Sequence, residues 1–102
     1  MAKEVNGVEL EEEIKEGLVL VDFFSRTCGP CKMLSFILDA VDKEIEQVKI
    51  VKVCFEENKE TVEKYGVEGY PTIILFKDGE EVERKQALQQ KPVIEKMIKE
   101  YI

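Results

Sequence analysis

The chain has 102 residues, which is enough for one compact domain over residues 1–102 and leaves no room for a second. Its hydrophobic fraction of 44% and charged fraction of 36% are typical of a soluble globular protein, and its formal net charge of -7 disfavours nucleic acid and anionic membranes as partners, because phosphates are held by Lys and Arg. The longest wholly aliphatic run is Leu18 to Val21, far short of the roughly 20 residues that a membrane-spanning helix needs.

The N-terminal stretch "MAKEVNGVELEEE" is polar and acidic. It has no hydrophobic segment that could serve as a secretory signal, so we expect a cytoplasmic protein. A first helix is predicted from about Val8 to Glu16, with Gly17 as its stop. The next stretch, "LVLVDFF" (18–24), predicts a strand that is buried on both faces and interrupted only by Asp22.

A long helix is predicted to begin at Cys28, because apolar residues after it recur at intervals of three and four. The valine-rich segment from Val48 to Phe55 predicts a second strand. Asn58 is a good N-cap for a short helix that Gly66 would terminate.

The Asp78-Gly79 pair lies between two extended runs and predicts a hairpin, since a tight two-residue turn needs positive φ at its centre. The strand after it is too charged for a central position and is predicted at a sheet edge. Pro92 can start a last helix whose apolar side packs on the sheet, with Val93, Ile94, Met97, Ile98, Tyr101 and Ile102. These elements predict an α/β fold with a central mixed sheet flanked by helices, in which a βαβ unit is followed by a β-hairpin and a C-terminal helix.

Three cysteines and no histidine narrow the possible chemistry. The odd cysteine count argues against a structural disulfide framework, and the missing histidine removes Cys-His catalysis and mixed Cys/His zinc sites. In "SRTCGPCKML" (25–34), Cys28 lies at a strand-to-helix junction, where the free N–H groups and dipole of the helix stabilise a thiolate. Cys28 is therefore the better nucleophile, and Cys31, about one turn later and further inside, is the resolving thiol.

The residues between the two cysteines suit this role. Gly29 removes bulk beside the attacking sulfur, and Pro30 fixes φ at a place where its missing N–H costs the helix nothing. Two alternatives remain open for a lone CxxC pair: two packed cysteines, or half of a zinc site. A zinc site would need two more ligands, for which only Cys54 and carboxylates are on offer.

Two segments resemble the thioredoxin family, and the resemblance spans nearly the whole chain. "VDFFSRTCGPCKMLSFILD" (21–39) resembles the thioredoxin active-site segment, and "GVEGYPTIILFKDGE" (66–80) resembles its second block. The resemblance implies a thioredoxin fold and dithiol-disulfide exchange at the cysteine pair. It also implies a cis-proline at Pro71 that faces the pair, with the backbone of Tyr70 available to bind an extended segment of the substrate. The substrate-binding residues are then Thr27, Gly29, Pro30, Tyr70 and Pro71.

Asp22 interrupts a strand that should be buried, where an unpaired carboxylate is costly and its pKa tends to rise. It is either the polar end of a strand or a catalytic group that exchanges a proton with Cys31 when the mixed disulfide resolves. The resemblance favours the second interpretation and implies Lys52 as the partner of this aspartate. Cys54 shares strand parity with Lys52 and is either a simple buried cysteine or a third redox thiol.

The sequence departs from the family at several positions. Thr27 stands where thioredoxins usually have tryptophan, Phe24 replaces the other common tryptophan, and the chain contains none at all. The Thr27 hydroxyl either donates to the Cys28 thiolate or faces water. Phe36 occupies the place of a proline that usually kinks the long helix, so a straighter helix is expected. Gln86 stands where the family commonly has a glycine that lines the groove, and its side chain would narrow access.

We therefore predict a cytoplasmic, monomeric thioredoxin-like disulfide reductase. The Cys28 thiolate attacks a target disulfide, and Cys31 then displaces the mixed disulfide. The expected partners are disulfide-containing target proteins and an electron donor of the thioredoxin-reductase type, with no nucleic acid, no membrane and no cofactor. Loss of tryptophan removes part of the docking surface and predicts a restricted target set. The alternatives are a non-catalytic thioredoxin-fold binding module, or a protein that holds a metal or an iron-sulfur cluster between two chains.

Overall fold

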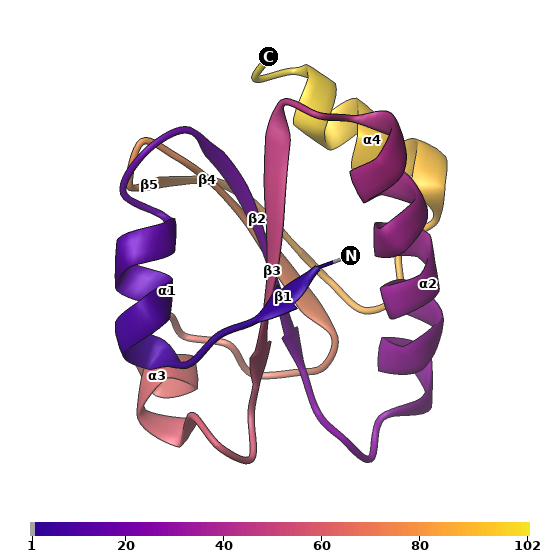
Figure 1. Cartoon of the computed structure of the whole chain (residues 1–102). Coiled ribbons are helices and arrows are strands. Elements are labelled where there is room, and N and C mark those ends of the chain that lie inside the picture. The colour runs from indigo at the N-terminus through magenta and orange to yellow at the C-terminus, as the bar shows by residue number, and fades with distance from the viewer. Residues whose placement is uncertain (1) are drawn as a thin grey trace.

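The computed structural model describes residues 2–102, which form a five-stranded mixed sheet with helices on both faces (Figure 1). The strands are β1 (Lys3–Glu4), β2 (Leu18–Phe24), β3 (Val48–Cys54), β4 (Thr72–Lys77) and β5 (Glu80–Gln86). The helices are α1 (Gly7–Glu13), α2 (Gly29–Glu44), α3 (Lys59–Lys64) and α4 (Lys91–Lys99). The strand order in the sheet is β1-β3-β2-β4-β5.

Strands β2 and β3, together with α2, form the predicted βαβ unit. Strand β2 pairs with β3 in parallel and with β4 antiparallel, and α2 makes the crossover from β2 to β3. Strand β5 pairs antiparallel with β4 at the edge of the sheet, as its charged sequence predicts. The turn between them has positive φ at both Asp78 (48°) and Gly79 (88°), which confirms the predicted hairpin.

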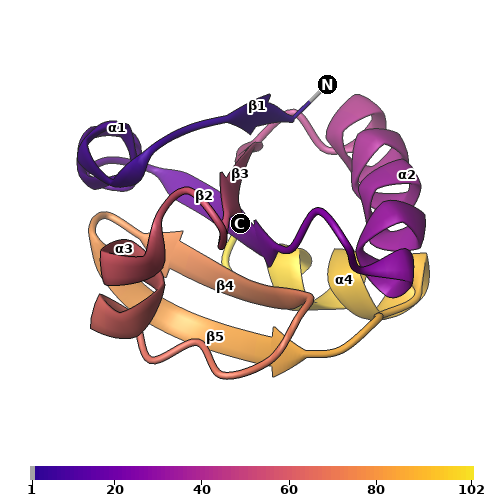
Figure 2. The ribbon, with the colours of Figure 1, turned by 90° about the horizontal axis from the view of Figure 1, so that it is seen from below.

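Helices cover the two faces of the sheet in pairs, α1 with α3 on one face and α2 with α4 on the other (Figure 2). Side chains alternate along β2, so Val21 and Phe23 pack beneath α1 and α3, whereas Leu20 packs beneath α2 and α4. Asp22 has the same parity as Leu20. The carboxylate therefore lies on the face of the sheet that α2 covers.

Three details differ from the sequence-based expectations. Strand β1 is not predicted, because two exposed residues are too few to show an alternating pattern. Helix α1 ends at Glu13 rather than Glu16, and the chain reverses at Gly17, whose φ is 77°. Val93 on α4 is 41% exposed, and Ile102, which lies beyond the end of α4 at Lys99, is 59% exposed, so neither belongs to the packed side of the helix.

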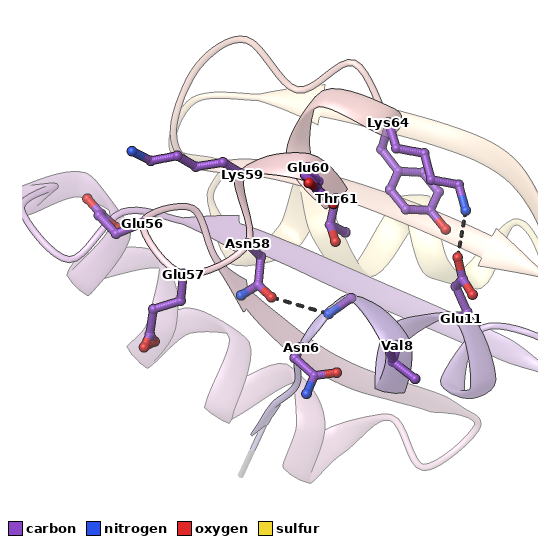
Figure 3. A pocket seen from close by; sticks show the side chains of 12 residues that line it. Asn6, Val8, Glu11, Glu56, Glu57, Asn58, Lys59, Glu60, Thr61 and Lys64 are labelled. Carbon is purple, nitrogen blue, oxygen red and sulfur yellow. Dashed lines mark hydrogen bonds and ion pairs between the residues drawn. The ribbon is translucent and has the colours of Figure 1, made fainter.

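Helices α1 and α3 approach each other closely where α1 begins. Figure 3 shows the Asn58 side chain directed at this backbone, where its Oδ1 accepts a hydrogen bond from the Gly7 N–H (3.2 Å), and Lys64 paired with Glu11 (2.7 Å). Asn58 is the predicted N-cap residue of α3, but its side chain makes no cap hydrogen bond there and serves α1 instead. A methyl group on Gly7 would collide with Oγ1 of Thr61.

Gly7→Ala is therefore expected to lower the free energy of unfolding by about 1–3 kcal/mol, although alanine is the better helix former. Urea unfolding of the variant and the parent protein measures this difference. Gly69→Ala is the matched control, because a methyl there meets nothing within 4 Å. Removing the colliding atom in Gly7→Ala/Thr61→Ala should recover part of the loss, and an unchanged midpoint for Gly7→Ala alone would contradict the close approach.

Candidate active site

Cys28 and Cys31 lie at the first turn of α2. Cys28 is the N-cap residue with extended backbone, and its Sγ accepts a hydrogen bond from the Cys31 N–H (3.1 Å). The two residues are joined by a disulfide, with their Cα atoms 5.3 Å apart. Cys28 is half-buried, whereas Cys31 is only 4% exposed. An incoming disulfide therefore meets the Cys28 sulfur before it can meet the Cys31 sulfur.

The remaining residues of the motif form an exposed rim around Cys28. Pro30 occupies the first turn of α2, where backbone N–H groups have no partner inside the helix, so its missing N–H removes no helical bond. A methyl group on Gly29 would meet nothing within 4 Å apart from its chain neighbours, so the surface at this position is open. Thr27, Gly29 and Pro30 are all exposed.

The structure brings Tyr70 to the cysteine pair. Tyr70 and Cys28 both pack against a small cluster formed by Phe24, Cys31 and Cys54, and the Tyr70 ring lies 5.0 Å from that of Phe55. The following peptide bond to Pro71 is cis, as the resemblance implied. Tyr70 and the cysteine pair therefore meet at the same small cluster.

The chain after β5 returns to this proline. The Pro71 carbonyl accepts a hydrogen bond from the Ala87 N–H (2.8 Å). Gln86 is exposed and lies opposite Thr72 in the sheet. The conformation that favours glycine is found one residue later, at Ala87, whose φ is 67°. Near this edge of the groove, the positive-φ backbone conformation that favours glycine is therefore adopted by Ala87 and not by Gln86.

Asp22 is fully buried beneath α2. Its side chain is 0% exposed, and neither carboxylate oxygen has a hydrogen-bond partner. Burial without compensating hydrogen bonds disfavours the charged form, and this raises the pKa of Asp22 to about 7 against the opposing pull of the Lys52 charge. Such a carboxyl group can accept or release a proton near neutral pH.

Lys52 is next to Asp22 in the sheet, but its ammonium group is bonded elsewhere. The two residues are register partners in the β2–β3 pairing. Lys52 Nζ donates to Ser35 Oγ (2.9 Å) and lies 4.8 Å from the centroid of the Phe24 ring. Ser35 was not singled out from the sequence, although its place one turn after Cys31 on α2 is a signal that could have identified it.

The loop before Cys28 is fixed by carboxylates from other segments. Glu56 accepts hydrogen bonds from the Ser25 hydroxyl (2.5 Å) and the Arg26 N–H (3.1 Å), which hold the pKa of Glu56 down at about 2. The Arg26 guanidinium pairs with Glu4 (2.8 Å) and Glu57 (2.7 Å). These contacts join the loop to β1 and to the segment between β3 and α3, and none of them is predicted by the sequence pattern.

The same network decides the direction of the Thr27 hydroxyl. Its oxygen lies 3.3 Å from Ser25 Oγ. Ser25 has one hydroxyl proton and gives it to the Glu56 carboxylate, which can only accept. The Thr27 hydroxyl therefore donates to Ser25 in the disulfide form, where the Thr27 side chain is exposed, and its donation to a Cys28 thiolate stays a prediction.

Cys54 is a free and fully buried cysteine in the cluster beside Cys31. Its Sγ donates to Glu56 Oε1 (3.4 Å). Burial raises the pKa of the Cys54 thiol, which disfavours the thiolate that exchange chemistry needs. These contacts describe a packed thiol, and a third redox role stays a prediction.

A surface hollow of about 530 Å³ opens beside α2, and we call it the α2 hollow. Its lining residues are Phe24, Ser25, Arg26, Cys31, Lys32, Ser35, Phe36 and Lys52. Helix α2 runs without interruption past Phe36, whose side chain is 77% exposed at this rim. The α2 hollow therefore gives solvent a way to the Ser35–Lys52 contact from outside the helix.

Within residues 2–102, no three His, Cys, Asp or Glu side chains are grouped so that they could hold a metal ion. Over the same described part of the chain, none of the helices combines the length and the apolar character needed to cross a bilayer.

The geometry of the cysteine pair defines the class of protein. A reachable sulfur at a helix N-terminus, bonded to a buried sulfur one turn later, is the arrangement of a dithiol-disulfide exchange protein. The sequence matches the family model for Thioredoxin over residues 1–100. The chain belongs to the thioredoxin family.

Relatives and solved structures agree with this assignment. The chain is 43% identical to a thioredoxin of Chlamydia trachomatis, with 99% of each chain covered, and 41% identical to a thioredoxin of Bacillus subtilis, with 88% of each covered. The crystal structure of Fasciola hepatica thioredoxin superimposes with a TM-score of 0.89 at 33% identity, covering 100% of both chains. The predicted thioredoxin fold and the predicted thiol-disulfide reductase activity are therefore confirmed.

The buried carboxylate predicts a pH-dependent stability. Because the pKa of Asp22 rises from 3.8 to about 7 on folding, its contribution to stability is fully present below about pH 4 and is lost as the pH rises through 7. Asp22→Asn cannot ionise, so the variant is expected to be more stable than the parent by up to about 4 kcal/mol near pH 8.5. Urea unfolding of both oxidised proteins near pH 4.5 and pH 8.5 measures the two differences. A difference that does not grow between these two pH values would contradict the assignment.

Proposed function

We propose that this protein reduces the disulfides of a restricted set of target proteins, with Cys28 as the nucleophile and Cys31 as the resolving thiol. The observation that carries the proposal is the unequal exposure of two sulfurs that share one helical turn. The Cys28 thiolate attacks one target sulfur, and the other target sulfur leaves as a thiolate. The free N–H groups at the start of α2 stabilise the negative charge on Cys28 before this attack.

The second step needs a base near Cys31. Cys31 must lose its proton before its sulfur can attack Cys28 and release the target's second thiol. Asp22 lies buried on the α2 face of the sheet, and a pKa of about 7 suits a carboxylate that takes this proton near neutral pH. The products are a reduced target, the Cys28–Cys31 disulfide and a protonated Asp22.

Continued turnover requires a supply of two electrons per target disulfide. We propose an electron donor of the thioredoxin-reductase type, in line with the family, and a monomeric protein. A cytoplasmic location is proposed because a free buried thiol at Cys54 and an odd cysteine count suit a reducing compartment.

The restricted target set rests on the rim around Cys28. The exposed position just before the motif is a threonine whose hydroxyl is bound to Ser25, and Phe24 is only 9% exposed. The rim therefore offers a docking partner less flat apolar surface than a tryptophan would.

A trapping experiment tests the two cysteine roles. Cys31→Ser keeps the nucleophile but cannot resolve the mixed disulfide, so target proteins should stay bound to Cys28 after capture from an oxidised extract. The matched control is Cys28→Ser, which should trap no targets. Mass spectrometry of the adducts identifies the bonded sulfur. Equal trapping by both variants would contradict the assignment of Cys28, and a reactive Cys28 that traps nothing would favour a binding module or a metal-holding protein.

Target restriction is tested by comparing substrates of different size. We expect the protein to reduce a small aromatic disulfide readily, because that reaction needs only an accessible Cys28. Insulin reduction coupled to dithiothreitol should be slower than with a tryptophan-containing thioredoxin, because insulin must also dock on the rim. Thr27→Trp should raise the insulin rate and leave the small-disulfide rate little changed. Insulin reduction as fast as that of the reference thioredoxin would rule out the restriction.

A further inference from the structure

Lys52 has two neighbours that can accept a hydrogen bond from its ammonium group. One is the Ser35 hydroxyl at the α2 hollow, to which Nζ donates (2.9 Å). The other is the carboxylate of Asp22, its register partner, which has no hydrogen bond. In the structure, the ammonium group occupies the first site and leaves the second without a donor.

Three physical effects favour the outer site. The Ser35 hydroxyl accepts a hydrogen bond, the Phe24 ring lies 4.8 Å from Nζ, and the α2 hollow gives water access to the charge. Moving the ammonium inward would strip this water from the charge beside a fully buried carboxylate. The Ser35 hydrogen bond therefore contributes directly to the balance between the two positions.

The environment of Asp22 leaves Lys52 as the charge that acts on it. Helix α2, which covers this face of the sheet, carries the uncharged residues Cys31 and Ser35, and on β3 the register partner of Asp22 is Lys52. The neighbour of Asp22 on β4 is the apolar Ile73, and α4 contributes apolar side chains to this layer, namely Ile94, Met97 and Ile98. Among the described residues, Lys52 is the charged group whose attraction opposes the effect of burial.

We propose that Ser35 is a positioning residue that holds the Lys52 ammonium group away from Asp22 and thereby sets how readily the carboxylate takes the Cys31 proton. This inference rests on the proposed function of Asp22 as the base. It assigns to Ser35 an action through Lys52 alone, since Ser35 donates nothing to the carboxylate itself.

Removing the Ser35 hydroxyl should change the pKa of Asp22 in one direction only. Without the Ser35 hydroxyl, Lys52 loses its outer partner and moves toward the negative carboxylate. An opposite charge at closer range favours the ionised form, so the pKa of Asp22 should fall. We expect a fall of about 1 unit in Ser35→Ala. Ser35→Thr keeps a hydroxyl at the same place and should restore the parent value.

The direct test is an NMR titration of the Asp22 carboxyl carbon in the oxidised protein. We compare the parent protein with Ser35→Ala, Ser35→Thr, Lys52→Met and the double variant Ser35→Ala/Lys52→Met. The expected result is a lower midpoint in Ser35→Ala and equal midpoints in Lys52→Met and the double variant. An unchanged midpoint in Ser35→Ala, or a shift that persists without Lys52, would overturn the proposal.

A kinetic arm separates this inference from the proposed function. Ellman's reagent releases one coloured thiolate when Cys28 attacks it and a second when Cys31 resolves the mixed disulfide. The midpoint of the second phase against pH should move down by about 1 unit in Ser35→Ala, whereas the first phase should keep its profile. If the NMR midpoint moves and the second phase does not, Ser35 still positions Lys52, but Asp22 is not the base. If neither moves, the positioning role itself is wrong.

Discussion

The register between β2 and β3 is the constraint on which the site depends. The two strands pair in parallel from Leu18↔Val48 to Phe24↔Cys54, which sets Asp22 beside Lys52. Because side chains alternate between the faces, a slip of one residue in β2 would turn Asp22 away from α2 and bury it beneath α1 and α3. The apolar pattern of these strands therefore aligns the redox centre, although none of their apolar side chains takes part in the chemistry.

In the proposed mechanism, burying Asp22 without hydrogen bonds lowers the stability of the fold and gives the carboxylate a proton affinity that suits a base near neutral pH. Hydrogen-bond donors around Asp22 would stabilise its ionised form in the core and lower its pKa. The carboxylate would then stay ionised through the physiological range and be a poor acceptor for a thiol proton. Leaving both carboxylate oxygens without a hydrogen bond keeps the group near the point of titration. The surrounding core on both faces of the sheet tolerates this one unfavourable group.

The strands and α2 could be predicted because their apolar residues repeat with the right periods, and the cysteine pair could be interpreted because its geometry is local. The contacts of Ser25, Arg26, Ser35 and Glu56 could not. A polar side chain on a predicted surface gives no sign of which distant group it will meet, and Glu56 lies about thirty positions from the loop that it holds. The resemblance to thioredoxins indicated Lys52 as the partner of Asp22, but only the structure shows that the Lys52 ammonium group donates a hydrogen bond to Ser35.

The two ends of the chain differ in how they contact the loop that precedes Cys28. Arg26 binds Glu4 of the first strand, so the N-terminal segment is tied to the residues that immediately precede the nucleophile. The C-terminal helix finishes at the opposite end of the sheet from the start of α2 (Figure 1). A bead, an electrode or a fusion partner attached through Ile102 would thus leave the sulfur-bearing end pointing into solution, whereas the same attachment at the N-terminus would pull on the active-site loop.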